Sequence, residues 1–270
     1  MPKQHNLNTI ELLVDAGVSE AIANTPNNLL KPKKPAVAKA TTPAPALPKA
    51  AVAVPLPVQS SNNASLNQII ASARQAAEAA TTLEELRKAV ESFDGCSLKK
   101  MANKTVFADG NPDTRVMLIG EAPGADEDIQ GIPFCGMSGQ LLDKVLKSIN
   151  LDRKTGFYIT NTLFWRPPGN RKPTPEELAI CEPFLEKHVA LVNPKVLLLV
   201  GATAVTGILK NNDSMGKLRS KLFTYKNRYM QHEVPVMVTY HPSFLMRSPI
   251  NKRLAWDDMQ MLKNFLAENK

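Results

Sequence analysis

Four short runs of mostly apolar residues divide the second half of the chain. They are Val116–Ile119, Phe157–Thr160, Val196–Val200 and Val236–Thr239. Runs of this length without polar alternation are typical of strands buried on both faces. Segments with helical periodicity fill the intervals between them. Because buried strands that alternate with helices form parallel sheets covered on both sides, the pattern predicts an α/β fold with three layers, α/β/α.

Helical patterns also precede and follow these runs. We expect helices over 65–80 and 82–92, the second with Thr82 and Glu85 at the spacing of a capping box. A third helix is predicted after Thr174, since this residue is followed by proline and then by Glu177 three positions on. The amphipathic stretch from Lys252 predicts a C-terminal helix whose apolar side packs on the sheet.

The first 64 residues differ in composition from the rest of the chain. Nine of the 21 prolines lie there, interleaved with alanine and lysine. We therefore predict three parts: a short amphipathic helix within 1–25, a disordered Pro/Ala/Lys-rich linker over 26–64, and one domain over 65–270. The short helix either docks on its own domain or, joined by the linker, binds a protein partner.

Charge and cysteine content narrow the class of protein. The formal net charge is +8 and the isoelectric point is near 9.3, which favours a polyanionic partner, either nucleic acid or an anionic membrane surface. No apolar stretch reaches the roughly 18 to 20 residues that span a bilayer, and the N-terminus lacks the apolar core of a secretion signal. We expect a soluble, cytoplasmic, monomeric protein. The three cysteines lack CxxC spacing, so reduced thiols are predicted.

Polar groups follow each of the four apolar runs. The loop GEAPGADED, which starts at Gly120, follows the first run, Asn161 the second, Gly201-Ala202-Thr203 the third and His241-Pro242-Ser243 the fourth. In open α/β sheets ligands bind beyond the carboxyl ends of the strands, so we expect these groups to converge. The loop is acidic, and it matches neither G-x-x-x-x-G-K-[ST] nor G-x-G-x-x-G, which argues against a nucleotide-phosphate enzyme.

The distribution of charge favours a nucleobase as the ligand. Few positive charges lie in the converging segments, whereas basic residues lie just outside, within 166–172 and 217–221 and at Arg247. This arrangement predicts a neutral ring in the pocket and a phosphate backbone along its rim. The amide of Asn161 suits the imide edge of a pyrimidine, and Phe134 can stack on a ring. Taken singly, Asn161 could be a turn residue, Phe134 a core residue and His241 a structural imidazole.

Four separated motifs resemble one known family. GEAPGADED, GIPFCG, NTLFWRPPGNRKP and HPSFL occur in the order found in the uracil-DNA glycosylase superfamily, specifically in its family 4, and the resemblance covers about residues 90 to 268. It implies a central four-stranded parallel sheet and a DNA-repair hydrolase associated with the bacterial nucleoid. The implied reaction is base excision: uracil is flipped out of DNA and its N-glycosidic bond is hydrolysed, which leaves an abasic site.

The resemblance also implies roles for single residues. Phe134 would stack on the flipped uracil, Asn161 would read its polar edge, and backbone groups of Glu121 and Ala122 would contact the base. The catalytic residues would be Glu127, Glu121 and His241, with Glu127 on the water side and His241 at uracil O2.

Contacts to DNA are expected from the basic segments and from the turn after HPSF. Leu245 is the predicted wedge that fills the gap left by the flipped base, and Arg247 is expected to bind an adjacent phosphate. Further DNA contacts are predicted at Arg166, Arg171, Ser243, Lys217 and Arg219.

The chain departs from the family pattern in two places. Ala122 stands where the best-known uracil-DNA glycosylases carry aspartate, so water would be handled by Glu127 or Glu121, of which we prefer Glu127. Family 4 members typically hold a 4Fe–4S cluster on four cysteines. This chain keeps Cys96 and Cys181 but has Phe93 and Trp165 at the other two positions. We therefore predict no cluster and no other metal, with a small aromatic core in its place.

One alternative function remains open at this stage. A non-catalytic DNA-binding module of the same fold, associated with replication, would share the sheet and the basic rim. The presence of Glu121, Glu127, Asn161 and His241 together favours the enzyme.

Overall fold

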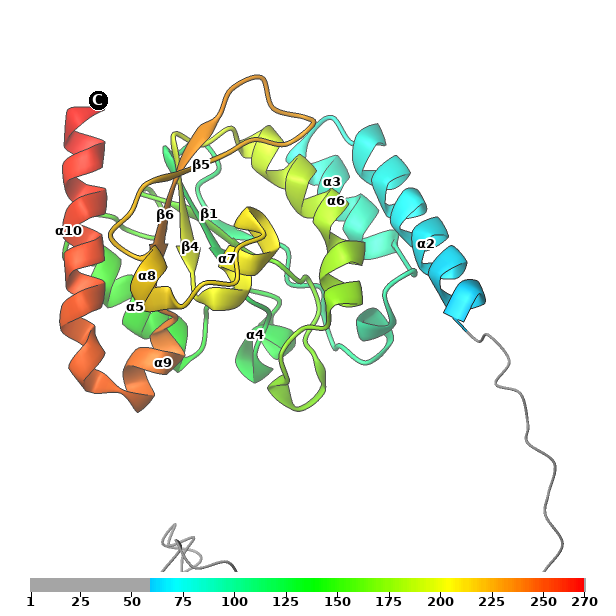
Figure 1. The fold of residues 1–270 in the computed structure, drawn as a ribbon, viewed down its shortest axis with the longest axis horizontal. Coiled ribbons are helices and arrows are strands. Elements are labelled where there is room, and N and C mark those ends of the chain that lie inside the picture. The colour runs from blue at the N-terminus through cyan, green and yellow to red at the C-terminus, as the bar shows by residue number, and fades with distance from the viewer. Residues whose placement is uncertain (1–58, 270) are drawn as a thin grey trace, which may run out of the picture. The chain divides into compact units, whose positions relative to one another are not determined.

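A six-stranded sheet forms the centre of the computed structural model, which describes residues 59–269, with side chains from residue 65 (Figure 1). The strand order is β1-β3-β2-β4-β6-β5. The strands are β1 (Asp109–Gly110), β2 (Val116–Gly120), β3 (Tyr158–Asn161), β4 (Val196–Val200), β5 (Phe223–Tyr225) and β6 (Val234–Thr239). The inner strands β3, β2, β4 and β6 are parallel, which confirms the predicted four-stranded parallel sheet.

The two edge strands were not predicted. β1 pairs antiparallel with β3, and β5 pairs antiparallel with β6, so the sheet is mixed. Both are very short and partly exposed, with two and three residues. Such short pairings leave neither an apolar run nor a clear alternation in the sequence. Short edge strands of this kind limit edge-to-edge association with other chains.

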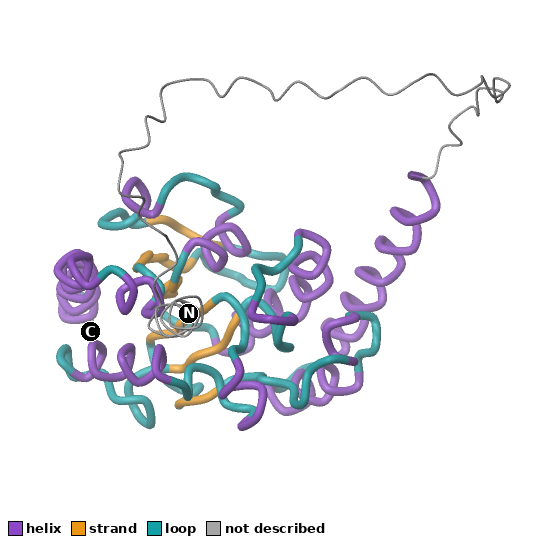
Figure 2. The backbone as a smooth tube through the Cα atoms, turned by 90° about the horizontal axis from the view of Figure 1, so that it is seen from below, coloured by secondary structure: helices purple, strands orange, loops and turns teal. Residues whose placement is uncertain are grey.

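The inner strands are mostly apolar because each is covered on both faces (Figure 2). In β2, Val116 and Leu118 belong to one apolar cluster, while Met117 and Ile119 belong to the cluster on the opposite face. The first cluster is completed by α5 (Met137–Lys147) and α10 (Lys252–Glu268), and the second by α6 (Pro175–Val192) and α7 (Ala202–Leu209). The three-layer α/β/α prediction is therefore confirmed, and α10 is the C-terminal helix that we expected.

The helices before the sheet pack mainly on α6. They are α2 (Gln59–Ala79) and α3 (Leu83–Ser92), and both contact α6. Thr82 caps α3 in a capping box with Glu85, and Thr174 caps α6 in a capping box with Glu177. Helix α2 starts six residues earlier than expected, within the last part of the predicted linker.

Short elements connect the layers. They are η1 (Ser97–Lys100), α4 (Ala125–Gln130), η2 (Pro168–Asn170), α8 (Met215–Leu218), α9 (Pro242–Arg247) and η3 (Pro249–Asn251). Within residues 59–269, no helix has the length and apolar character needed to cross a membrane. The predicted helix within 1–25 and almost all of the predicted linker lie outside the described residues.

Candidate active site

Side chains from distant parts of the chain meet at the carboxyl end of β2. A Cβ atom added to Gly120, the last residue of β2, would collide with the Phe134 ring and with Oδ1 of Asn161. Glycine is therefore required at this position, because any side chain would displace both groups. Gly201, which follows β4, has φ +94, and a Cβ atom there would lie 3.0 Å from Cβ of His241. The strand ends thus bring together Phe134, Asn161 and His241, as predicted.

Asn161 presents an unsatisfied acceptor at this point. The residue ends β3 and is 1% exposed, and its Oδ1 has no hydrogen-bond partner within the described part of the chain. A buried amide oxygen without a donor costs about 1 to 3 kcal/mol, so such atoms are uncommon outside functional sites. A donor on a bound molecule would remove this cost.

His241 lies at the start of α9, with its ring 5.7 Å from the Phe134 ring between centroids. Its Nδ1 accepts a hydrogen bond from the backbone N–H of Ser243 at 3.2 Å and lies 2.8 Å from the hydroxyl oxygen of that residue. Burial lowers the pKa of His241 below its usual value, partly offset by the negative charge of Glu121. A neutral imidazole whose Nδ1 accepts carries its proton on Nε2, so Nε2–H is available as a donor.

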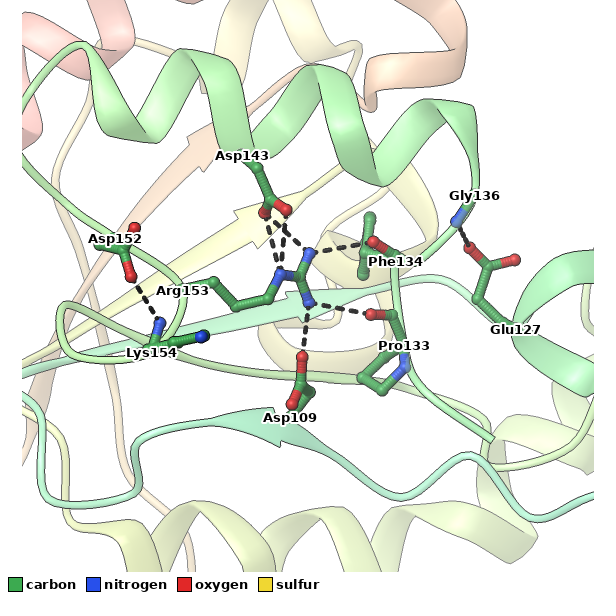
Figure 3. A network of polar contacts seen from close by, with 9 residues as sticks. All are labelled: Asp109, Glu127, Pro133, Phe134, Gly136, Asp143, Asp152, Arg153 and Lys154. Carbon is green, nitrogen blue, oxygen red and sulfur yellow. Dashed lines mark hydrogen bonds and ion pairs between the residues drawn. The ribbon is translucent and has the colours of Figure 1, made fainter. Parts of the chain in front are cut away.

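Phe134 is held in an unusual backbone conformation by Arg153 (Figure 3). Its φ angle is +53, a left-handed value that costs a residue with a Cβ atom about 1 to 2 kcal/mol. Arg153 donates to the carbonyl oxygens of Pro133 at 3.0 Å and Phe134 at 2.9 Å, and it pairs with Asp109 and Asp143. The network therefore fixes the loop that carries the aromatic ring, from a residue that the sequence motifs did not single out.

Glu127 has both carboxylate oxygens occupied. One accepts the backbone N–H of Gly124 and the other that of Gly136, each at 3.0 Å, and Figure 3 shows the second contact. The side chain thus joins the start of α4 to the loop that precedes α5. The structure gives Glu127 a role in holding these loops. This role does not favour Glu127 as the carboxylate that handles water, which was the preferred expectation from the sequence.

Glu121 has one carboxylate oxygen held and the other open. Its Oε2 accepts the hydroxyl hydrogen of Thr203 at 2.5 Å, whereas Oε1 has no hydrogen bond within residues 59–269. The backbone carbonyl of Glu121 is occupied by the Thr162 hydroxyl at 2.5 Å and the Leu163 N–H at 3.2 Å, so it is not free to contact a ligand. Of the two candidate carboxylates, Glu121 is the one with an oxygen that accepts no hydrogen bond within the described residues.

The predicted basic contacts divide into engaged and exposed side chains. Arg219 is only 8% exposed and forms an ion pair with Asp258 at 2.7 Å. It also donates to the backbone carbonyl of Leu254. This burial contradicts its predicted contact with DNA, because the guanidinium already satisfies a buried carboxylate.

Two further arginines also have partners within the protein. Arg171 donates to both carboxylate oxygens of Glu177, and Arg166 donates to Asn170 at 2.7 Å and lies 4.0 Å from Asp128. Lys217 and Arg247 are exposed, and neither has an ion pair within the described residues. These two remain the freest of the predicted phosphate contacts.

The predicted wedge is not at the surface. Leu245 is 4% exposed and lines an apolar cavity between α5 and α10, so it has no access to DNA in this conformation. The adjacent Met246 is 39% exposed, and its Sδ lies 4.0 Å from the hydroxyl oxygen of Ser138 at the start of α5. In a helix, successive side chains point in directions about 100° apart, which is why the position after Leu245 faces solvent.

Packed rings surround Cys96 and Cys181 in the region where the sequence predicted a small aromatic core. We call the side chains of Phe93, Cys96, Phe164, Trp165, Cys181 and Phe184 the aromatic cluster. Phe93 and Phe184 are in edge contact with centroids 5.1 Å apart, and the Trp165 N–H donates to Thr105 at 3.0 Å. Cys96 and Cys181 are free thiols. Their mutual hydrogen bond, and then burial, raise the pKa of Cys181.

These residues do not fit a cluster with four cysteine ligands. Two sulfur ligands are present, and the remaining volume is occupied by Phe93 and Trp165, neither of which coordinates iron. Cys135, the third thiol of the chain, follows Phe134 in the site loop, where burial and Glu127 raise its pKa to about 11.

Known proteins are similar to this chain over the part that contains the strand-end site. The sequence profile of the uracil DNA glycosylase superfamily matches residues 107–260. The chain is 34% identical to the type-4 uracil-DNA glycosylase of Thermotoga maritima over 189 residues, 69% of this chain and 95% of that protein. It is 31% identical to that of Sulfurisphaera tokodaii over 193 residues, 70% and 87% of the two chains. It is also 32% identical to the type-4 uracil-DNA glycosylase of Pyrobaculum aerophilum over 197 residues, which cover 70% of this chain and 99% of that protein.

Two residues of the site escaped the sequence-based prediction. Thr203 lay in a turn that was expected to converge with the others, but its type gave no sign of a contact with Glu121. Arg153 lies in a segment between α5 and β3 without any motif. Only the folded chain brings these side chains to their partners.

Proposed function

The chain belongs to the uracil DNA glycosylase superfamily, and from that premise we propose that the strand-end site recognises and excises uracil from DNA. The observation that carries the assignment to this site is the unsatisfied Oδ1 of Asn161, buried beside the Phe134 ring and close to His241. An amide that lacks a donor matches the imide edge of uracil, which has an N–H beside a carbonyl oxygen.

Recognition requires the base to leave the DNA stack. Flipping costs a few kcal/mol and is least costly where the base pair is already weak. Phe134 would stack on the extruded ring, while Asn161 accepts from N3–H with Oδ1 and donates to O4 with its amino group. The hydrogen bonds of Arg153 hold the loop of Phe134 before the base arrives, which supports a site that is formed in advance.

Bond cleavage leaves negative charge on uracil and positive charge on the sugar. Nε2–H of His241 would donate to O2 of the departing uracil, and its neutral state keeps this donor aimed without a second charge in the site. The sugar becomes oxocarbenium-like, as in other glycoside hydrolyses. We assign Glu121, through its open oxygen, to the water and to the developing cation, with Glu127 as the residue that holds the loops.

Contacts to the DNA backbone are proposed for Arg247 and Lys217, and also for Ser243 and Arg166. Met246 is proposed as the apolar side chain that fills the gap in the stack, because it is the exposed apolar residue of α9. This assignment replaces Leu245, whose side chain is packed inside.

We further propose that this enzyme works without an iron–sulfur cluster. The support is the donor set, with two thiols and two aromatic rings at the positions of the four ligands. Protein reconstituted anaerobically with iron and sulfide should bind neither in stoichiometric amounts. The double variant Phe93→Cys/Trp165→Cys, which restores four thiols, is the control for the reconstitution. Stoichiometric iron and sulfide in the wild type would contradict this proposal.

The proposed activity is tested with an oligonucleotide that carries a single uracil. After incubation and treatment with alkali, the strand should be cut at the uracil position, and free uracil should be released. Loss of scission in His241→Ala and Asn161→Asp would support the assignment of the site. Tight binding of the oligonucleotide without uracil release by the wild type would instead indicate a non-catalytic DNA-binding module.

A further inference from the structure

Thr203 makes a direct contact with the carboxylate proposed to handle water. Its hydroxyl donates to Oε2 of Glu121 at 2.5 Å, and it is the one side-chain donor to that carboxylate among residues 59–269. A hydroxyl carries a single hydrogen, so this bond uses the whole donor capacity of Thr203. Hydrogen bonds to ionised acceptors are about twice as strong as neutral ones, and they are correspondingly short.

The local backbone explains why Thr203 can reach Glu121. Gly201, with φ +94, turns the chain sharply between β4 and α7, and Thr203 follows in the first turn of that helix. The neighbouring β2 ends at Gly120, directly before Glu121, and β2 pairs with β4. Two side chains that are 82 positions apart therefore meet across adjacent strand ends.

Threonine suits this task because its side chain is stiff. Branching at Cβ restricts χ1 to few rotamers, so the hydroxyl is fixed by its hydrogen bond with little loss of entropy. Glu121 has three rotatable bonds, and a donor on Oε2 fixes where Oε1 lies. A catalytic group that is misplaced by about 1 Å can lose about 100-fold in rate.

From these contacts we infer that Thr203 is a positioning residue, which holds Glu121 so that Oε1 faces the attacking water. The inference rests on the proposed uracil-excising function and on the role given there to Glu121. Thr203 itself makes no contact with the substrate in this account. Its effect on the rate therefore passes entirely through the carboxylate.

The test compares three variants in single-uracil excision. Thr203→Val keeps the shape and removes the hydroxyl, Thr203→Ser keeps the hydroxyl, and Thr206→Val removes a threonine hydroxyl of the same helix that bonds Asn211 and Asn212 instead. Thr203→Val should lower kcat by about 10- to 100-fold with KM close to the wild-type value. Thr203→Ser should recover most of that loss, and Thr206→Val should behave as wild type.

A double-mutant cycle separates positioning from a general structural effect. In a Glu121→Ala background, Thr203→Val should cause no further loss, because the group that it positions is gone. The inference is overturned if Thr203→Val is as active as Thr206→Val, or if its loss persists in full in the Glu121→Ala background. A wild type that releases no uracil would overturn the proposed function itself, and the inference with it.

Discussion

The strand-end site and the aromatic cluster both bury polar atoms, but they differ in how these atoms are satisfied. At the strand ends, Asn161 has a buried oxygen without a donor, and one oxygen of Glu121 has no hydrogen bond within the described residues. In the aromatic cluster, the Trp165 N–H donates to the Thr105 hydroxyl, and the free thiols of Cys96 and Cys181 are fully buried. The first region keeps capacity for a ligand, whereas the second resembles an ordinary protein core.

The two imidazoles differ in their location: His188 is buried inside the protein, where its Nδ1 has no partner among the described residues, whereas His241 is half-buried at the strand-end site. His188 of α6 is fully buried against Phe107, with ring centroids 4.3 Å apart, and it shares a hydrogen bond with the Tyr158 hydroxyl. His241 lies among the site residues and has its Nδ1 bonded to Ser243. Burial thus lowers the pKa of both residues, but the geometry makes only His241 a candidate for chemistry.

The largest expected effect is on the stability of the aromatic cluster. Trp165→Ala should lower the free energy of unfolding by about 3 to 5 kcal/mol, because it leaves a large cavity in a packed core. Urea denaturation measures the loss. The matched control is Trp256→Ala, since the Trp256 side chain is 44% exposed and its removal should cost far less. Equal losses in the two variants would show that the aromatic cluster is not a packed core.

A substitution at the strand ends should act mainly on catalysis. Asn161→Asp should lower uracil excision by about 100- to 1000-fold, because a carboxylate replaces the amide that pairs with the uracil edge and repels the uracil anion. Thermal unfolding checks that the variant is folded at the assay temperature, since a carboxylate without a partner at this buried position also lowers stability. A stable Asn161→Asp variant that keeps its activity would show that the active site does not lie at the strand ends.

Titration of His188 should be visible in stability rather than in activity. Burial, and then the charge of Arg87, lower its pKa from 6.5 to about 3. The unfolded chain therefore takes up this proton first, and stability falls as the pH drops below 6.5, by up to about 1.4 kcal/mol per pH unit from this group.

The variant His188→Gln isolates that contribution. It cannot titrate, so its free energy of unfolding, measured with urea at pH 7, 6 and 5, should fall less steeply than that of the wild type. Parallel curves for the two proteins would mean that His188 is not the buried neutral group described here.

The smallest predicted effect concerns Met246. Met246→Ala should lower excision from duplex DNA by about 10-fold, or roughly 1.4 kcal/mol of the few kcal/mol that unstacking requires. Excision from single-stranded DNA should change much less, because no stack has to be held open. Leu245→Ala is the comparison variant: if the duplex-specific loss appears there and not in Met246→Ala, the wedge assignment made from exposure is wrong.

Repetitive features of the sequence predicted most of the fold. The four inner strands are visible as apolar runs because both faces of the sheet are covered, and Thr82 and Thr174 mark helix starts through their capping boxes. The edge strands β1 and β5 could not be predicted, since pairings of two or three residues leave no periodicity. Each of these two edge strands forms only through its pairing with a neighbouring strand, β3 or β6, which a local sequence pattern does not show.

The site was predicted by residue type but not by contact. The convergence of Phe134, Asn161 and His241 follows from strand ends that share one edge of the sheet. Sequence order could not reveal that Glu127 binds two backbone N–H groups, that Arg219 pairs with Asp258 inside the protein, or that Leu245 points inward. Each of these facts depends on a partner far away in the chain or on the phase of a short helix.

The most direct test of the central claim is a crystal structure with uracil bound. The account predicts uracil at the carboxyl ends of β2 and β3, stacked on Phe134, with N3 and O4 within about 2.7 to 3.2 Å of the side-chain amide of Asn161. Uracil bound elsewhere on the protein, or an Asn161 oxygen that accepts from a protein group while uracil is present, would contradict it.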